Sequence, residues 1–281
     1  MLGPAAAGLL LIASPFAASA QQGDAKRGDY LSKAAGCVGC HTEEKKDAQP
    51  YAGGRALQTP FGTFHGPNIT PHPQAGIGRW SEQDFIRAMR EGRRPNGAHY
   101  FPAFPYPSFT RINDQDLRDL WAYLRSLSQS SRANQPHELK FPFGWRWLVW
   151  GWKLLFFKPG PFVADPAKNP ALNRGAYLVN ALGHCGECHT PRNFLGGPKR
   201  NRALAGSKLA KAPNLTPTRL KNKGDGELKE FLLTAMTPDG DVAAESMAEV
   251  VQNTTRQLRP QDLDALIAYL RSLPALPDEP K

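Results

Sequence analysis

Residues 37–41 read Cys-Val-Gly-Cys-His and residues 185–189 read Cys-Gly-Glu-Cys-His, and these two stretches contain all four cysteines of the chain. Two thiols followed directly by an imidazole form the C-x-x-C-H signature at which c-type haem is attached. The thiols of such a motif add to the vinyl groups of the porphyrin, and the histidine can bind the iron from the proximal side. The sequence therefore predicts two c-type haems with their iron, attached through Cys37, Cys40 and His41 and through Cys185, Cys188 and His189.

Other uses of paired cysteines fit the spacing less well. A structural zinc site usually pairs two C-x-x-C knuckles about 15–20 residues apart, whereas these pairs lie about 148 residues apart and each ends in histidine. A thioredoxin-like redox motif or a structural disulfide would leave the trailing histidine unexplained in both copies. Haem attachment is the interpretation that accounts for all three side chains of each motif.

Residues 1–20 indicate export. They contain no charged side chain, they include an apolar run from Gly8 to Ala13, and they end in the small-x-small sequence Ala18-Ser19-Ala20. The apolar run is shorter than a membrane span requires, so a cleaved signal peptide is favoured over an uncleaved anchor, although the usual positive charge at the start is missing. Because c-type haem is attached outside the cytoplasm in bacteria, we expect a periplasmic protein.

The chain is basic, with a formal net charge of +10 at neutral pH. The basic residues are spread along the chain without a long run, and this argues against nucleic-acid binding. A diffuse positive surface is better suited to steering the protein toward an acidic redox partner or an anionic membrane face.

The sequence contains an internal duplication. The pattern Arg-Gly-x-Tyr-Leu occurs at 27–31 and at 174–178, and Pro-Asn-Ile-Thr-Pro at 67–71 recurs as Pro-Asn-Leu-Thr-Pro at 213–217. With the haem motifs and the repeated Ala-Tyr-Leu-Arg-Ser-Leu near each end, these landmarks keep one order and an offset of about 146 to 148 residues. We therefore expect a signal peptide at 1–20, a first domain at 21–135, an aromatic linker at 136–172 and a second domain at 173–281.

Each copy predicts the same helical plan. A short helix precedes the haem motif, a long loop rich in Gly and Pro follows, and a middle helix begins near Ser81 or Gly226. In the closing helix of the first copy, the apolar residues follow helical spacing: Leu117, Leu120, Trp121 and Leu124. No strand alternation stands out. The expected fold class is all-α, with two tandem helical domains, each wrapped round a haem that supplies much of the core.

This arrangement resembles the class I cytochrome c fold. More closely, the mature chain resembles the dihaem cytochrome c subunits of periplasmic dehydrogenases, among them the alcohol, gluconate and aldehyde dehydrogenase complexes. The matching segments are Arg-Gly-x-Tyr-Leu before each haem motif, 68–71 with 76–80, 101–109 and 183–193, and the resemblance covers roughly residues 24–275. It implies an electron-relay subunit with no catalytic residues of its own, and it does not name the dehydrogenase.

The resemblance also implies a sixth ligand for the second haem. A thioether opposite histidine stabilises ferrous haem and raises its potential, and the resemblance places that thioether at Met247. Met236 is the competing candidate, but it ends the expected middle helix, where packing beside Leu232 and Leu233 is favoured. Met247 is therefore the expected axial ligand opposite His189.

The first copy departs from the pattern of the related subunits. They commonly read Tyr-Pro-Ala-Met-Pro-Tyr where this chain reads Phe-Pro-Ala-Phe-Pro-Tyr, so that Phe104 stands in the ligand position and cannot bind iron. His99 could swing in as the sixth ligand, the distal site could be open or water-bound, or Met89 could reach the iron. His99 is favoured. Replacement of methionine by histidine or by nothing should lower the potential of the first haem relative to the second. Two further histidines on loops are outside candidates: His65 and His72.

The segment 141–157 contains four of the six tryptophans, Trp145, Trp147, Trp150 and Trp152. It is too short and too charged to span a bilayer easily. Three roles stay open: an interfacial helix that makes a peripheral membrane contact, a dock for a partner subunit, and a staple between the two domains.

The favoured function is a periplasmic dihaem c-type cytochrome that relays electrons from a dehydrogenase subunit to a respiratory-chain acceptor, which could be another cytochrome, a quinone or an oxidase. The alternative is a peroxidase-like dihaem enzyme that uses an open distal site at the first haem. The distal loop offers no obvious acid–base group except His99, and this argues against the enzyme. A sensor function finds little support in the sequence.

Overall fold

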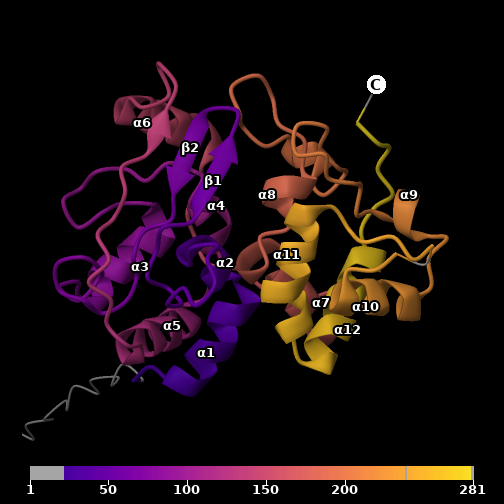
Figure 1. Ribbon diagram of the computed structural model, residues 1–281. Coiled ribbons are helices and arrows are strands. Elements are labelled where there is room, and N and C mark those ends of the chain that lie inside the picture. Colours follow the sequence, from indigo (N-terminus) through magenta and orange to yellow (C-terminus); the bar gives the residue numbers. More distant parts are fainter. Residues whose placement is uncertain (1–21, 238, 280–281) are drawn as a thin grey trace, which may run out of the picture.

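The structure, a computed structural model, describes residues 22–237 and 239–279, so the signal peptide expected at 1–20 lies outside the described residues. The described chain forms two halves that lie side by side (Figure 1). The first half, indigo to magenta, holds helices α1 to α6, and the second half, orange to yellow, holds α7 to α12. The expected all-α class with two tandem helical units is confirmed.

Capping side chains set where the helices of the first half begin. Asp24 accepts hydrogen bonds from the backbone N–H groups of Lys26 and Arg27 at the start of α1, and Ser81 and Asp84 form a capping box at the start of α3. The helices are α1 (Ala25–Ala34), α2 (Cys37–His41), α3 (Glu82–Glu91), α4 (Tyr106–Phe109), α5 (Asp114–Ser126) and α6 (Arg146–Phe156).

The second half repeats this plan with small changes. Its first helix, α7, continues into a π-helical turn at 178–182, and α11 is longer than its counterpart α4. The helices are α7 (Pro170–Tyr177), α8 (Gly186–His189), α9 (Pro217–Leu220), α10 (Asp225–Thr234), α11 (Glu245–Asn253) and α12 (Pro260–Arg271), with 3-10 turns at Arg200–Arg202 and Thr255–Gln257.

The glycine of each Arg-Gly-x-Tyr-Leu pattern lies where two helices cross closely. A Cβ atom on Gly28 of α1 would lie 2.0 Å from the carbonyl oxygen of Asp119 on α5, and one on Gly175 of α7 would lie 2.0 Å from that of Ala265 on α12. Neither distance is compatible with a side chain, so glycine is required at both crossings. The repeated glycine therefore marks the same helix–helix contact in both halves.

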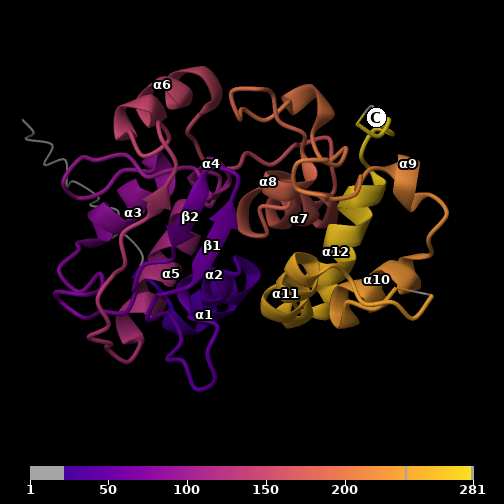
Figure 2. The ribbon, with the colours of Figure 1, turned by 45° about the horizontal axis from the view of Figure 1, so that its top comes forward.

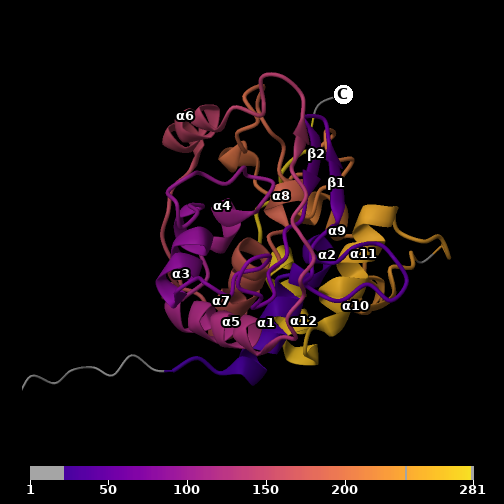
Figure 3. The same cartoon turned by 60° about the vertical axis from the view of Figure 1, so that its left-hand side comes forward.

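The structure adds a three-stranded antiparallel sheet that the sequence did not predict. Its order is β1 (Ala56–Thr59), β2 (Gly62–His65) and β3 (Glu138–Leu139). The strands are short, and β3 lies in the segment expected to be a linker. That segment also supplies α6, which lies at the same end of the molecule as the β1–β2 hairpin (Figures 1 and 3).

A reciprocal pair of hydrogen bonds joins the two halves. Tyr177 of α7 donates to the carboxylate of Asp116 on α5 at 2.6 Å, and Tyr30 of α1 donates to that of Asp262 on α12. Tyr30 and Tyr177 occupy the same place in the two repeats, and so do the two aspartates. Burial and the neighbouring carboxylate raise the pKa of Tyr30 to about 12, so this hydroxyl keeps its proton at neutral pH. We name these four residues the interdomain clasp.

Each clasp aspartate also binds an arginine of its own half. Arg27 pairs with Asp116, and Arg174 pairs with Asp262 at 2.7 Å. The buried carboxylates are therefore neutralised within one half and hydrogen-bonded from the other, as buried charges require. Buried apolar side chains of both halves form one continuous core cluster, so the halves pack as one body.

Candidate cofactor sites

The first C-x-x-C-H motif forms helix α2. Gly36, with φ of 63°, turns the chain in the left-handed region between α1 and α2, and Cys37 and Cys40 form no disulfide. The Nδ1–H of His41 donates to the carbonyl oxygen of Pro67 at 2.7 Å. Because this bond fixes the proton on Nδ1, the Nε2 lone pair of His41 is available for a metal ion.

The second motif repeats this geometry on α8. The Nδ1–H of His189 donates to the carbonyl oxygen of Pro213 at 2.7 Å, and Pro213 begins the second copy of the Pro-Asn-Leu-Thr-Pro segment. The next residue in each copy, Asn68 or Asn214, holds the loop by accepting hydrogen bonds from the threonine two residues later. The duplicated loop therefore orients the proximal histidine of each motif.

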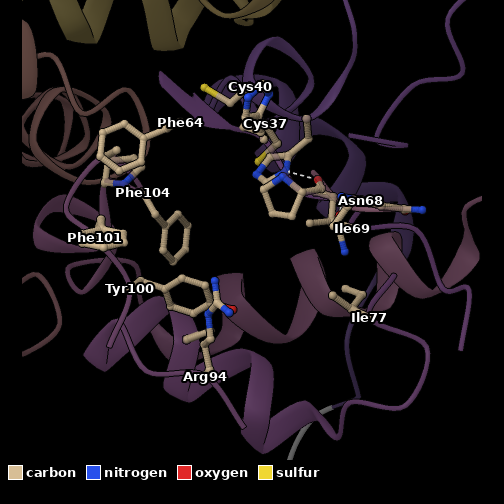
Figure 4. Close-up of a pocket in the computed structure, with 18 of the residues that line it drawn as sticks. Cys37, Cys40, Phe64, Asn68, Ile69, Ile77, Arg94, Tyr100, Phe101 and Phe104 are labelled. Carbon is tan, nitrogen blue, oxygen red and sulfur yellow. Dashed lines mark hydrogen bonds between the residues drawn. The ribbon is translucent and has the colours of Figure 1, made fainter. Parts of the chain in front are cut away.

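A cavity of about 930 Å³ opens beside the first motif. Its volume lies at the upper end of the usual range for ligand and cofactor cavities, roughly 300–1,000 Å³. The side chains that face Cys37 and His41 across it are mostly apolar, and Figure 4 shows Phe104 pointing into the cavity from the side that faces Cys37 and Ile69. Further apolar lining comes from Ile77, Trp80, Phe85, Met89, Phe109, Leu120 and Leu124.

The cavity also holds two arginines that have no carboxylate partner among the described residues. The Nε atom of Arg94 is buried without a hydrogen-bond partner, and Arg146 donates only to the backbone carbonyl of His99 at 2.7 Å. Burial and the positive charge of Arg94 lower the pKa of Arg146. Two partly buried like charges favour a bound anion, and the two propionates of haem are anionic. The lining therefore fits haem both at its apolar face and at its charged end.

His99, the favoured sixth ligand of the first haem, is not brought to this cavity. Its backbone forms a β-bridge with Arg93, and its Nδ1 atom lies 3.0 Å from Nζ of Lys153 on α6. Burial and the charge of Lys153 lower the pKa of His99, which therefore favours the neutral ring that accepts from the ammonium. His72 is also elsewhere, because its Nδ1 atom caps a turn by accepting from the N–H of Ala75. Met89 and His65 do line the cavity.

The loop that follows the middle helix has the same backbone in both halves. Gly92 ends α3 and Ala235 ends α10, both in the left-handed region with φ of 59° and 62°. A β-bridge follows in each, between Arg93 and His99 and between Met236 and Val242. All these pairs are related by an offset of 143 residues.

This offset shows which residue of the first half corresponds to each methionine of the second half. Met236 stands at the place of Arg93 and is 49 % exposed, so it lies on a surface turn. Continued along the loop, the same offset places Met247, on α11, at the position of Phe104. The offset therefore pairs Met247, the expected ligand of the second haem, with Phe104 of the first half.

Two histidines of the first cavity were not expected from the sequence. His137 lies between Phe64 and Phe101 and accepts a hydrogen bond at Nδ1 from the backbone N–H of His65 at 3.1 Å. His184, from the second half, lines the same cavity and contacts Phe109 edge-on at 5.3 Å. Both come from segments far from the first motif in sequence, and no local pattern could have linked them to it.

The second motif lies at the boundary between the halves. Figures 1 and 2 show α8 beside the β1–β2 hairpin of the first half. Ser108 of α4 donates to Glu187 of α8 at 2.7 Å, and His184 directly precedes Cys185. The attachment segment of the second haem therefore contacts the distal loop of the first cavity.

Comparison with known proteins finds cytochrome c matches in both halves of the chain. The cytochrome c family model matches twice, over residues 25–128 and 172–274. The chain is 43 % identical to a diheme cytochrome c-type protein of Cereibacter sphaeroides, over 90 % of this chain and 87 % of that protein. It is 40 % identical to the fructose dehydrogenase cytochrome subunit of Gluconobacter japonicus, and 37 % identical to the cytochrome c subunit of the quinone alcohol dehydrogenase of Gluconobacter oxydans. These matches cover 93 % and 97 % of this chain but 55 % and 60 % of the two dehydrogenase subunits.

Proposed function

The chain belongs to the cytochrome c family, and we propose that it relays electrons in the periplasm from a dehydrogenase to an acceptor of the respiratory chain. It is an electron-transfer cytochrome with two c-type haems. The observation that carries the relay is the contact between the second attachment segment and the first haem cavity, made by His184 and by the bond from Ser108 to Glu187. An electron that enters at one haem therefore has a direct path through this single folded protein to the other haem.

The chain supplies binding, orientation and exclusion of water, while haem supplies a one-electron change at its iron. The thiols of each motif anchor one edge of the ring, and Pro67 and Pro213 fix the rotation of the proximal imidazoles. The interdomain clasp and the shared core hold the two sites at a constant separation. Such a fixed pair suits repeated transfer, because no domain movement has to precede each step.

The names of the relatives guide the choice of electron donor. Five of them are cytochrome subunits of fructose, alcohol or gluconate dehydrogenases, and another is a subunit of a nicotinate dehydrogenase. A donor of this class, which oxidises a small organic substrate, is the partner proposed for this chain. The net charge of +10 would favour an acidic docking face on that partner.

The segment 141–157 supports a peripheral membrane contact as part of this function. The side chains of Trp147, Trp150 and Leu154 on α6 are 65 %, 56 % and 67 % exposed, and they follow one another at helical spacing. Lys140 and Lys158 flank the helix on the exposed surface. Exposed tryptophans beside lysines fit the headgroup region of an anionic bilayer. No helix among the described residues is long and apolar enough to cross a membrane.

The test uses the purified holoprotein in its ferric form. It is mixed with a periplasmic and membrane fraction of its source bacterium and with ethanol, gluconate, fructose or nicotinate in turn, and the absorption of ferrous haem is followed. One substrate should reduce both haems, and a heat-treated fraction should not support the reaction. If none of the four reduces the protein and hydrogen peroxide is turned over instead, the peroxidase-like alternative replaces the relay.

A further inference from the structure

Phe104 of the first half corresponds to Met247 of the second half by the offset of 143 residues. The two loops share their left-handed cap and their β-bridge, after which Phe104 lies in a bend before α4 and Met247 lies inside α11. In Figure 4, Phe104 points into the first cavity from the side facing Cys37, whose motif includes the proximal His41. A phenyl ring has no lone pair to donate to a metal ion. The protein therefore places Phe104, which cannot bind iron, where the sixth ligand of the first haem (haem 1) would be expected.

An aromatic cluster holds this ring in position. The centroid of Phe104 lies 5.3 Å from that of Tyr100, 6.4 Å from that of Tyr106 and 5.8 Å from that of Phe109, in tilted or edge-on contacts. Such contacts stabilise aromatic pairs by about 0.5–1.5 kcal/mol beyond the burial of their surface. Phe104 is thus a packed part of the cavity wall and not a side chain that swings away easily.

Three histidines besides His41 line the cavity, and each has a contact of its own. His65 lies on β2, where its Nε2 atom is 3.3 Å from the carboxylate of Glu138 and its Nδ1 atom has no partner among the described residues. His137 accepts from the backbone N–H of His65 and packs against Phe64 and Phe101. His184 is bound through Nδ1 to the carbonyl oxygen of Leu182 at 2.9 Å and lies against Phe109. Each ring would have to break a hydrogen bond or an aromatic contact in order to replace Phe104.

Met89 occupies a packing position. It is 6 % exposed and belongs to the core cluster together with Phe85. The offset of 143 residues that relates α3 to α10 places Leu232 at the equivalent position in the second half, and a leucine there can only pack. Met89 therefore matches a core residue of its sister domain.

We propose that haem 1 has no sixth ligand from the protein, and that the space under Phe104 binds a small neutral diatomic molecule such as carbon monoxide or nitric oxide. The lining around Phe104 is aromatic, which favours a neutral guest over an anion. Binding of carbon monoxide donates the carbon lone pair to ferrous iron, and no group leaves and nothing is oxidised. The second haem (haem 2), with Met247 as its sixth ligand, has no free position for such a molecule.

The experiment compares the wild-type holoprotein with Phe104→Met and Met247→Phe, each tested for two haems per chain by mass and for folding by circular dichroism. Electron spin resonance and magnetic circular dichroism of the ferric form should show one high-spin haem and one low-spin haem with the methionine signature. The dithionite-reduced form should bind one carbon monoxide per chain. The Phe104→Met variant should bind no carbon monoxide and show the methionine signature for both haems. The Met247→Phe variant should bind two molecules of carbon monoxide per chain.

Two low-spin haems and no binding of carbon monoxide in the wild type would overturn the proposal. If Phe104→Met fails to fold, Met89→Leu provides the second variant, because leucine already stands at the equivalent position of α10. This variant should keep the high-spin signal and the single carbon monoxide of the wild type. A change in either would identify Met89 as the ligand and refute the proposal, while leaving the relay function intact.

Discussion

At the scale of single residues, the two halves differ most at one side chain in each distal loop. Their proximal histidines are oriented by equivalent carbonyl oxygens, at the same distance of 2.7 Å. Phe104 lines the first cavity, and with Met247 as the expected ligand of the second haem the two haems would have different surroundings on the opposite side. Because a methionine ligand stabilises the ferrous form, the potentials of the two haems should differ.

The role of Met247 is tested by Met247→Ala. The variant should lose the far-red absorption of methionine-bound ferric haem, and the potential of haem 2 should fall by on the order of 100 mV, a modest part of the about 0.8 V that axial ligands span. Spectroelectrochemistry measures both. Met236→Ala is the matched control and should leave both unchanged, since Met236 is half exposed on a surface turn. An effect of Met236→Ala alone would reassign the ligand.

His184 is the second residue with a specific expected role. It adopts a left-handed conformation with φ of 39°, at the place where the first half has Gly36 with φ of 63°. Such a conformation costs about 1–2 kcal/mol for most side chains, so His184→Gly should fold at least as stably as the wild type. The loss of the contact with Phe109 should slow electron equilibration between the haems.

Flash photolysis of the partly reduced holoprotein measures this rate, and urea unfolding measures the stability. An unchanged rate in a folded His184→Gly protein would show that the ring only fills space. The matched control is Gly36→Ala in the first half, which should lower stability because alanine is disfavoured at φ of 63°.

At the scale of elements, the interdomain clasp makes stability depend on pH. Burial alone would raise the pKa of Asp262, but hydrogen bonds from Arg174 and Tyr30 outweigh it and hold this pKa below the ordinary value. The stabilisation is therefore complete above the ordinary pKa of about 3.9 and is lost as the pH falls through the lower pKa of the folded state.

Asp262→Asn should consequently destabilise the protein at pH 7, by about 1.5–3 kcal/mol for the weakened charged hydrogen bonds. It should also flatten the decline of stability below about pH 4. Urea unfolding at a series of pH values measures both effects. Asp264→Asn, on the same helix but exposed and paired with Lys229, is the control and should keep the wild-type profile. Equal pH profiles of stability for all three proteins would show that the interdomain clasp does not cause the pH dependence.

Much of the helical plan could be predicted from the sequence, because capping residues and apolar spacing are local signals. The start of α5 at Asp114 follows its cap Asn113, and the expected apolar stripe of that helix is buried at Leu117, Leu120 and Leu124. The sheet could not be predicted, since its strands have two to four residues and β3 pairs with a strand more than 70 positions earlier.

The candidate sites were predictable only where they depend on adjacent residues. Both attachment motifs and the departure at Phe104 are visible in the sequence. The position of His99 was not, because its direction is set by the bridge to Arg93 and by Lys153 of α6. Arg94 and Arg146 likewise meet only through the packing of α6 against the first cavity.

At the scale of the whole molecule, α6 and the β1–β2 hairpin lie at the same end of the protein (Figure 3), and both carry exposed apolar side chains. The hairpin tip contributes Phe61, which packs on Phe143 at 4.8 Å. The second half contributes Gly197 and Arg200, which contact Phe156 of α6, and Phe194 of the same loop is 95 % exposed. Both halves can therefore face one membrane surface.

Vesicle binding tests this surface. The holoprotein should cosediment with vesicles of phosphatidylethanolamine and phosphatidylglycerol, and less so at high salt. The double variant Trp147→Ser and Trp150→Ser should bind at least tenfold more weakly, since each ring buries a large apolar area. Leu209→Ser, at an exposed position in the second half, is the control and should bind like the wild type. Equal binding by all three proteins would contradict the membrane contact.

The central claim is that one protein body holds two haems with different sixth positions and passes electrons between them. An anaerobic redox titration of the holoprotein, followed by absorption and magnetic circular dichroism, tests this most directly. We expect two one-electron steps, with the methionine-bound haem 2 reduced first and haem 1 at a lower potential. A single step in which both haems are reduced at the same high potential, with two methionine signatures, would contradict the account.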